Sequence, residues 1–442
     1  MGDLFKTMFG AIAGPLILLV GLGMMYYTFR LLQIDLQPIV SVVIALSPIW
    51  LPVVLFYLLF DRWLEYARTK FRYENGRATL RIKLPQEVLK SPEAMESVFA
   101  QIHNPNNPDN LWQTYIDGKH PLTFSFELVS IGGEVRFYAN VPRKKTKDAL
   151  EAQLYAQYPG IEIVEEDLDY TAEVVWNPEE WELMSFHIAK KEDEIYPIKT
   201  YIDFGLDQQP KEELKFEPMA PLIEHLGKAR PYERLWVQIL MKPHAKKNFK
   251  SGSLQAAGTW EKRVHEKINE IMRRDKHRLG PEETESRPTL TPIERDTVTA
   301  MERNAGKYAY EVAIRGMYIA RAGKFNGEMI GPLTKSFAQY DIIGRNGIGV
   351  RWRTDFDYNW FSDFSGARKT ALKKEELEYY KLRAYEQKDV KGGADKMKVM
   401  SVEELATIYH LPGTAVVTPT LGRVEATRRE APANLPIGNL PT

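Results

Sequence analysis

The chain lacks cysteine, an excess of either charge, and any complete catalytic motif. Its 442 residues contain no cysteine, which excludes disulfides, thiolate metal sites and a cysteine nucleophile. This absence is consistent with a reducing compartment. Lysine and arginine together number 59, and so do aspartate and glutamate, so the net charge gives no reason to expect nucleic acid or an acidic partner.

Motifs for cofactors and catalysis are also missing. The eight histidines are scattered without the spacing of a metal site, and we expect His187 and His225 to be structural. Gly331 and Lys335-Ser336 resemble a phosphate-binding loop, but such a loop needs glycine directly before the lysine. No Gly-x-Ser-x-Gly elbow is present. We therefore expect no enzymatic activity and no cofactor.

What the chain has instead is a pair of uncharged apolar runs, residues 11–29 and 39–60. Each is long enough to cross roughly 30 Å of hydrocarbon at about 1.5 Å per helical residue. The alternative is a signal peptide, but its apolar region spans about 7 to 15 residues and ends at a cleavage site. Here a second apolar run follows at once. We therefore predict a two-helix transmembrane hairpin with a basic juxtamembrane segment over residues 1–72.

The charges around these runs predict an orientation. Between the runs lie Arg30 and Asp35, which cancel. After the second run come Arg62, Arg68, Lys70 and Arg72. Because basic residues favour the cytoplasmic side, we expect a protein of the cytoplasmic (inner) membrane with both termini and the soluble domains in the cytoplasm.

Residues 73–170 have the pattern of a β-α-β-β-α-β unit, which predicts a first ferredoxin-like domain. Alternating residues predict a half-buried strand, and Ser91 followed by Pro92 is a helix start. The expected elements are a strand at 77–84, a helix from Pro92 with Met95, Val98, Phe99 and Ile102 on one face, hairpin strands at 122–130 and 134–141, a helix at 145–157 with Ala149, Leu150, Leu154 and Tyr155 apolar, and a strand at 161–164.

Residues 171–365 repeat this order and predict a second ferredoxin-like domain. The expected elements are strands at 182–189 and 195–205, a helix at 219–228, strands at 235–241 and 308–319, a helix at 326–339 and a strand at 348–352. Gln157-Tyr158 and Gln339-Tyr340 end corresponding helices, which is a weak indication of duplication.

Residues 246–305 interrupt the second domain and predict an inserted helical hairpin. Its first arm is basic, and Arg273, Arg274, Lys276 and Arg278 are candidates for contact with nucleic acid or anionic lipid. The alternative is a solvated face balanced by acidic residues of the same helix. We favour the solvated face.

Residues 366–442 are expected to form a charged helix, a short helix and an extended tail. The charged pattern covers residues 366–387, and Ser401 with Glu404 is a capping box that begins the short helix. The tail from residue 418 is rich in proline and has the composition of a linker or peptide arm.

Several of these segments resemble a known family. They are Ser91 to Phe99, Phe126 to Tyr138, Leu154 to Pro159 and Glu403 to Pro412. They are similar to the membrane-anchored N-terminal region of conjugation-type (type IV secretion) HerA/FtsK-like transfer ATPases of reduced-genome bacteria. In many of these proteins the segment matching Asn434-Leu435-Pro436 leads into the motor. The present 442 residues contain no motor, so the resemblance implies that any motor is a separate polypeptide.

The resemblance implies a non-enzymatic membrane scaffold that docks a separate cytoplasmic transfer ATPase, and homo-oligomerisation stays open. We expect partner contact at Leu405, His410, Leu411, Pro412, Asn434 and Leu435, with ordinary packing as the alternative. We also expect removal of residues 400–442 to leave the rest of the chain folded. The alternative function is a nucleic-acid-binding subunit of the same kind of machine that uses the basic insert.

Overall fold

The computed structural model divides the chain into two compact units, Met1–Tyr66 and Ala67–Thr442, which are described separately. We call the second unit the body. The structure describes residues 21, 24, 27, 28, 37–85, 91–144, 146–207, 217–253, 258–272, 290–354, 363, 366–385 and 397–413.

Two helices cover the second apolar run. They are α2 (Gln37–Ala45) and α3 (Ser47–Asn75), and α3 continues into the body. Among the described residues, α3 is the one helix whose length and apolar composition suffice to cross a membrane, and 6% of its apolar window is buried. Of the first apolar run, only residues 21, 24, 27 and 28 are described, and they are helical.

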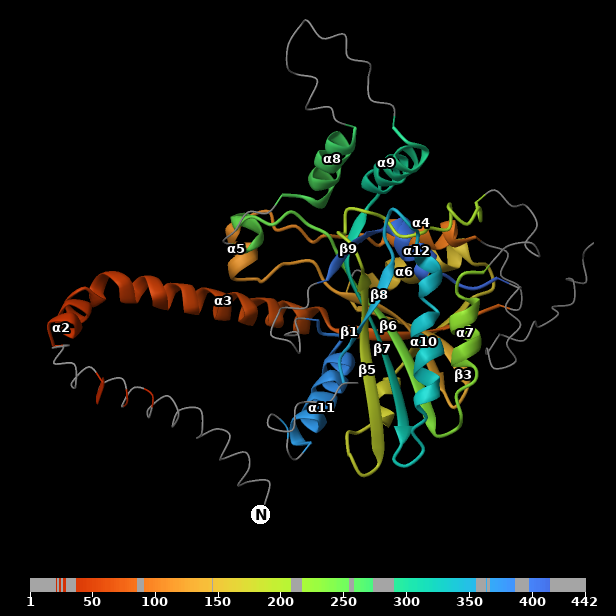
Figure 1. The fold of residues 1–442 in the computed structure, drawn as a ribbon, viewed down its shortest axis with the longest axis horizontal. Helices are drawn as coiled ribbons and strands as arrows, with labels where there is room; N and C mark the ends of the chain where they lie inside the picture. The colour runs from red at the N-terminus through yellow and green to blue at the C-terminus, as the bar shows by residue number, and fades with distance from the viewer. Residues whose placement is uncertain are drawn as a thin grey trace, which may run out of the picture. The chain divides into compact units, whose positions relative to one another are not determined.

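The body combines helices with one antiparallel sheet (Figure 1). Its strands are β1 (Arg77–Lys83), β2 (Phe124–Ile131), β3 (Glu134–Pro142), β4 (Glu162–Glu166), β5 (Trp181–Lys190), β6 (Glu233–Pro243), β7 (Ala309–Arg321), β8 (Ile348–Trp352) and β9 (Lys398–Ser401). Its α-helices are α4 (Pro92–Gln101), α5 (Leu111–Tyr115), α6 (Thr146–Gln157), α7 (Ala220–Leu226), α8 (Trp260–Ile271), α9 (Pro292–Ala305), α10 (Ile330–Lys335), α11 (Ala367–Leu382) and α12 (Val402–Ile408). Short 3-10 helices are η1 (Tyr170–Glu173), η3 (Phe249–Ser251), η5 (Gly327–Met329) and η6 (Ala338–Tyr340). The predicted α+β class is confirmed.

Eight strands lie in the order β4-β1-β3-β2-β6-β7-β5-β8, and β9 pairs with β7 beside the end of β5. The two halves of the sheet therefore meet at the β2–β6 pair. The strands of the two halves are arranged alike. From the outer edge of the sheet to the central pair, the order is β4-β1-β3-β2 in the first half and β8-β5-β7-β6 in the second. The turn between β2 and β3 is made by Gly132 and Gly133, both with positive φ, as a tight hairpin requires.

The two faces of the sheet have different coverings. On one face, α4, α6, α7, α10 and α12 bury the largest apolar core, to which β2 contributes Phe126 and Leu128. Successive strand residues point to opposite faces. On the other face, Val129 packs in a smaller cluster with Leu377 and Tyr380 of α11. The sheet is therefore buried on both sides.

Most predicted elements of the body are confirmed, including the helix that begins at Pro92 with Met95, Val98 and Phe99 buried. In α6, Leu150 and Leu154 are buried as predicted, but Tyr155 is 48% exposed and Ala149 is also exposed.

Two predicted elements are wrong. Residues 195–205 form no strand, because their amide groups bind the C-terminal helix instead: Ile198 N donates to Glu404 and Tyr201 N donates to Thr407. The predicted helix at 326–339 is broken into η5, α10 and η6.

The predicted insert lies between β6 and β7. Its helices α8 and α9 bury Trp260, Val264 and Ile268 against Val298 and Met301. The residues between the two helices, 273–289, are outside the described part.

A buried ion pair joins the C-terminal helix to the sheet. Lys190 Nζ on β5 lies 2.7 Å from Glu404 Oε1 on α12, and both side chains are 0% exposed. Removing one partner of such a pair leaves an uncompensated charge in the interior.

We predict that Lys190→Met lowers the free energy of unfolding by about 3–5 kcal/mol, because Glu404 stays buried without its counter-ion. Lys191 is a matched control, since it is half exposed and pairs with Asp341 at the surface. Lys191→Met should cost less than about 1 kcal/mol. Urea unfolding of the purified chain measures both values, and equal losses would contradict the prediction.

Candidate functional site

Residues 397–413, here called the closing segment, are part of the core of the body. The segment comprises β9 and α12, and every residue from Val399 to Gly413 is buried. The predicted capping box is confirmed: Ser401 accepts from Glu404 N, and Glu404 accepts from Ser401 N at 3.0 Å. β9 pairs with the first residues of β7, and α12 packs on α4.

The closing segment contains four of the residues predicted to contact a partner. Leu405, His410 and Leu411 are at most 1% exposed, and Pro412 is buried too. They pack inside the chain, as the alternative stated, and the structure offers none of them to a partner. Asn434 and Leu435 lie outside the described residues.

The burial of this segment also corrects the expected effect of a deletion. Removing residues 400–442 would take α12 out of the apolar core and remove Glu404 from Lys190. A deletion that leaves the body intact must therefore start after Gly413.

The imidazole ring of His410 makes two polar contacts that hold the end of the closing segment in place. Its Nε2 lies 2.6 Å from Glu217 Oε1, and its Nδ1 lies 2.9 Å from the carbonyl oxygen of Ala406. Burial acts to lower the pKa of His410, but Glu217 and the hydrogen bonds outweigh it and raise the pKa. Burial acts in the opposite sense on Glu217, yet His410 lowers the pKa of that carboxyl group. The geometry therefore favours a charged pair.

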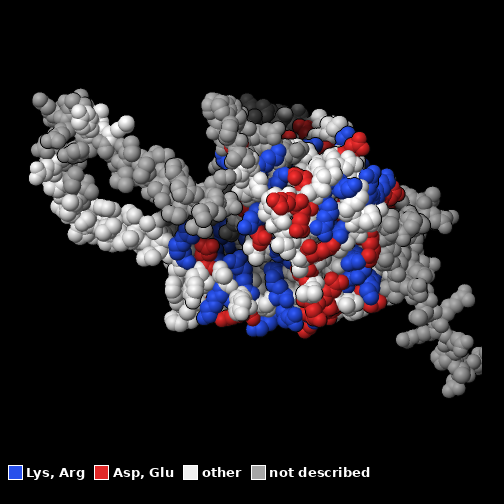
Figure 2. All heavy atoms as spheres, turned by 90° about the horizontal axis from the view of Figure 1, so that it is seen from below, with Lys and Arg blue, Asp and Glu red and all other residues white. Residues whose placement is uncertain are grey.

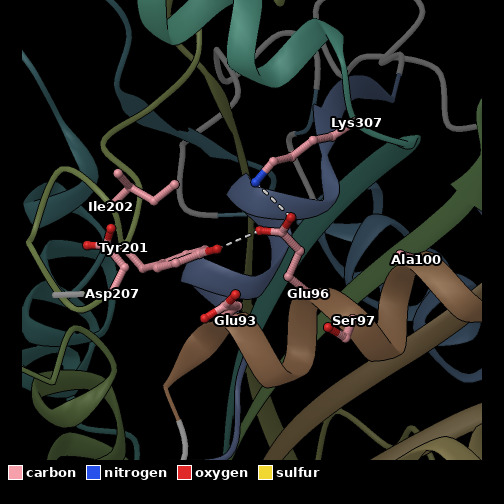
Figure 3. Close-up of a pocket in the computed structure, with 8 residues that line it drawn as sticks. All are labelled: Glu93, Glu96, Ser97, Ala100, Tyr201, Ile202, Asp207 and Lys307. Carbon is pink, nitrogen blue, oxygen red and sulfur yellow. Dashed lines mark hydrogen bonds and ion pairs between the residues drawn. The ribbon is translucent and has the colours of Figure 1, made fainter. Parts of the chain in front are cut away.

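A recess of about 330 Å³ lies beside the closing segment (Figure 3). It is lined by Glu93, Glu96, Ser97, Ala100, Tyr201, Ile202, Asp207 and Lys307. Lys307 Nζ lies 2.7 Å from Glu96 and 2.9 Å from Glu403 of α12. Tyr201 donates a hydrogen bond of 2.8 Å to the same Glu96. Three carboxylates and one ammonium group give the recess an acidic balance.

The chemistry of this recess is limited by its internal bonds. Burial acts to lower the pKa of Lys307, but Glu96 and Glu403 raise it, so the amine stays protonated and is a poor nucleophile. Burial and then Glu96 raise the pKa of Tyr201. The groups are arranged to hold α4 and α12 to the segment that follows α9, and carboxylates on the open side can accept hydrogen bonds from a cationic group.

On the opposite face of the sheet, polar residues form a buried belt. Glu127, Gln238, Arg315 and His187 are cross-strand neighbours on β2, β6, β7 and β5. All four side chains are at most 1% exposed. The belt therefore crosses the join between the two halves.

Helix α11 covers this belt and is held by it. Arg315 donates to the carbonyl oxygens of Tyr379 at 2.7 Å and Ala384 at 3.0 Å, at the C-terminal end of α11 and just beyond it. Arg383 makes two 3.0 Å bonds to Glu127. Burial acts to raise the pKa of Glu127, but Arg383, Ser125 and Tyr170 lower it to about 2. The belt is closed to solvent and acts as a structural network.

Sequence reasoning missed both networks. Ser125 and Glu127 alternate with apolar residues on β2, and alternation of this kind predicts a face in water. The structure covers that face with α11, which is distant in sequence. His187 and His225 are structural as predicted: His187 lies 3.3 Å from Glu376, and His225 lies 2.8 Å from the Met329 carbonyl oxygen.

The basic insert is described only in part, and Arg273, Arg274, Lys276 and Arg278 lie outside the described residues. On α8, Lys262 and Lys267 pair with Glu266 and Glu270, and Arg263 pairs with Glu194. In Figure 2, acidic and basic side chains are interspersed over the right part of the body, while basic ones predominate at its lower left. The described arm has the balanced character of a solvated face.

Comparison with known proteins places the chain in a family. Residues 65–347 match the family described as "Domain of unknown function (DUF8128)", and the chain belongs to this family. The match begins within α3 and ends directly before β8, so α11 and the closing segment lie outside it. No curated protein matches the chain.

We predict that the closing segment is held less firmly as pH rises above about 6.5, the ordinary pKa of histidine. The pKa of His410 is raised in the folded state, so protonated His410 contributes to the free energy of unfolding. This contribution is complete below pH 6.5 and is lost as pH rises through the raised pKa of the folded state. Thermal unfolding of the purified chain between pH 6 and 9 measures this. His410→Gln should flatten the decline, and His265→Gln, at an exposed position on α8, should leave it unchanged. An identical decline in His410→Gln would refute the assignment.

Proposed function

We propose that the chain is a non-enzymatic, membrane-anchored scaffold subunit that docks a separate cytoplasmic transfer ATPase in a type IV secretion or conjugation-like machine. The observation that carries the anchoring is the exposure of α3. Ile49, Val53, Phe56 and Leu59 are each at least 60% exposed on this helix. Apolar surface of this extent is unfavourable in water, and lipid removes the cost.

The anchor is proposed to be a hairpin, with residues 11–29 as one span and residues 39–60 as the other. Helices α2 and α3 support the second span. Arg62, Arg68, Lys70 and Arg72 follow it and favour a cytoplasmic location for the body. A location at the cytoplasmic (inner) membrane follows.

The body is proposed to consist of two ferredoxin-like units that arose by duplication. The equal strand orders, β4-β1-β3-β2 and β8-β5-β7-β6, support this proposal, as do helices at the corresponding crossovers. Tyr158 and Tyr340 add a further parallel: each is 2% exposed and lies before the last strand of its half. The second unit carries the helical insert.

A scaffold is proposed in preference to an enzyme because several charged groups with shifted pKa values in the described body are engaged in internal ion pairs. Glu127 binds Arg383, Glu217 binds His410, and Lys307 binds Glu96. Tethering needs no chemistry, since it raises the effective concentration of a partner at one surface.

The docking element is proposed to be the tail after Gly413. The closing segment fixes the position of Gly413, the last described residue, because Gly413 is buried and its N–H donates to Glu217. The family resemblance noted above concerns Asn434 and Leu435, which belong to this tail. The ATPase is proposed to bind there.

We predict that a chain truncated after Gly413 stays folded in the membrane and loses its ATPase. The tagged full-length and truncated chains are purified from the native host in detergent, and the eluates are compared for Mg²⁺-dependent ATP hydrolysis and by mass spectrometry. Replacing residues 414–442 with a Gly/Ser segment of equal length controls for chain length. Undiminished ATPase recovery from the truncated chain would count against tail docking.

We predict that the double substitution Val54→Arg and Leu58→Arg releases the chain from membranes into carbonate washes. A charge near the centre of a span costs about 2.5–3.5 kcal/mol per residue. Tyr66→Arg, also exposed on α3 but beyond the apolar run, is the control and should leave the chain in the pellet. If the unaltered chain is washed off, α3 is not an anchor.

A further inference from the structure

A second exposed apolar surface lies in the body, away from the closing segment and the belt. It consists of residues 109–120 with α5 and residues 246–252 with η3, and we call it the platform (Figure 1). Trp112 is 66% exposed and Phe249 is 53% exposed, and Leu111 and Ile116 are exposed beside them. Large apolar side chains that gather at the surface mark an interaction site.

Hydrogen bonds and a contact between aromatic rings hold the two segments of the platform together. Thr114 of α5 donates a 2.6 Å bond to the Lys250 carbonyl oxygen, and Tyr115 donates a 2.8 Å bond to the Phe249 carbonyl oxygen. The rings of Tyr115 and Phe249 lie 5.5 Å apart. The two segments, more than 120 residues apart in sequence, therefore present their exposed side chains as one surface.

The last turns of α3, which belong to the body, support the platform. Arg68 donates to the carbonyl oxygens of Ser251 and Gly252 at 3.3 and 3.4 Å. Gly118, with φ of +67°, lies so close to Ala67 that a Cβ atom would meet its carbonyl oxygen at 2.1 Å. Only glycine permits this approach. The platform is thereby attached at the point where the chain enters the body.

The surroundings of the platform are basic. Residues 67–75, 109–120 and 246–252 contain seven lysines and arginines and three acidic residues. Lys246 and Lys250 are exposed. Burial lowers the pKa of His120 in this region to about 4 against the hydrogen bond to the Gly118 carbonyl oxygen, and the nearby Arg68, Arg72 and Lys242 add to the lowering.

Chain connectivity keeps the platform near the end of the apolar run. Arg68 follows Phe60 by eight steps along the chain, so no conformation carries Arg68 more than about 29 Å from Phe60. If the apolar run spans a bilayer, the platform is therefore held close to the lipid headgroups. Tryptophan is enriched at that level of membranes, and lysine near it is attracted by anionic lipids.

We propose that the platform is a second membrane contact, in which Trp112 and its apolar neighbours enter the headgroup region of an anionic leaflet and Lys246 and Lys250 bind lipid phosphate groups. This inference rests on the membrane anchoring proposed above. Two adjacent contacts, one spanning and one interfacial, would restrict rotation of the body about its anchor. Together they would fix the direction in which the scaffold presents its tail.

The absence of native cysteine makes a direct test simple. Leu111→Cys in the platform and Leu382→Cys at the end of α11 each create one labelling site, and both leucines are exposed. The full chain is labelled with an environment-sensitive fluorophore and reconstituted into vesicles of phosphatidylcholine, with or without phosphatidylglycerol. Lipids that carry a headgroup-level spin label then report contact by quenching.

We expect quenching at position 111 and none at position 382 in vesicles with phosphatidylglycerol. Lys246→Glu with Lys250→Glu should reduce the quenching at 111, and so should vesicles without anionic lipid. The same double substitution should leave the emission spectrum of the environment-sensitive label at 382 unchanged, which controls for folding. Contact that persists equally on phosphatidylcholine alone would overturn the role of the lysines.

Carbonate extraction of the same samples separates the two proposals. A chain that resists extraction but shows no quenching at 111 keeps its anchor and overturns the platform contact, as would protection of position 111 by a copurified protein. A chain that is extracted yet is quenched at 111 loses the spanning anchor and keeps the interfacial contact. Extraction without quenching rejects both.

Discussion

The antiparallel pairing of β2 with β6 is the interaction on which the body depends, because it makes one sheet of two similar halves. Phe124 to Ile131 pair in register with Met241 to Arg234. This register sets Glu127 opposite Gln238 on one face and aligns apolar residues on the other. Since strand residues alternate between faces, a shift of one residue would bring charges into the large apolar core. The register of the β2–β6 pair therefore determines which side chains each face of the sheet presents to the helices that cover it.

The C-terminal part of the chain then closes both faces. Helix α11 covers the polar belt. Arg315 of the belt binds the last turn of α11, and Arg383, just after this helix, binds Glu127 of the belt. Helix α12 enters the apolar core on the other face and brings Glu404 to Lys190. Both helices follow the region that matches the family, yet the core of that region is completed by them.

Elements that depend on interactions between neighbouring residues could be predicted from the sequence, and those that depend on residues far apart in the sequence could not. Local signals sufficed for the helix after Ser91, the hairpin at Gly132-Gly133 and the capping box at Ser401, because each depends on neighbouring residues. The strand predicted at 195–205 failed because its amides bind Glu404 and Thr407, some 200 residues away. The burial of Leu405 and His410 was missed for the same reason: amphipathic spacing does not distinguish a partner surface from the chain's own sheet. The recess at Glu96 needed three distant segments and had no local signature.

The position of β9 also has a consequence for biogenesis. The edge of β7 that accepts β9, at Ala309 to Val312, is synthesised about 90 residues before β9 itself. At the usual translation speed of about 5–20 residues per second, that interval lasts roughly 5–20 s. During it the nascent chain exposes unpaired backbone groups and the apolar surface that α12 later covers. A ribosome-bound intermediate of this kind is a natural client for chaperones, and the maturation of the body is a late event in translation.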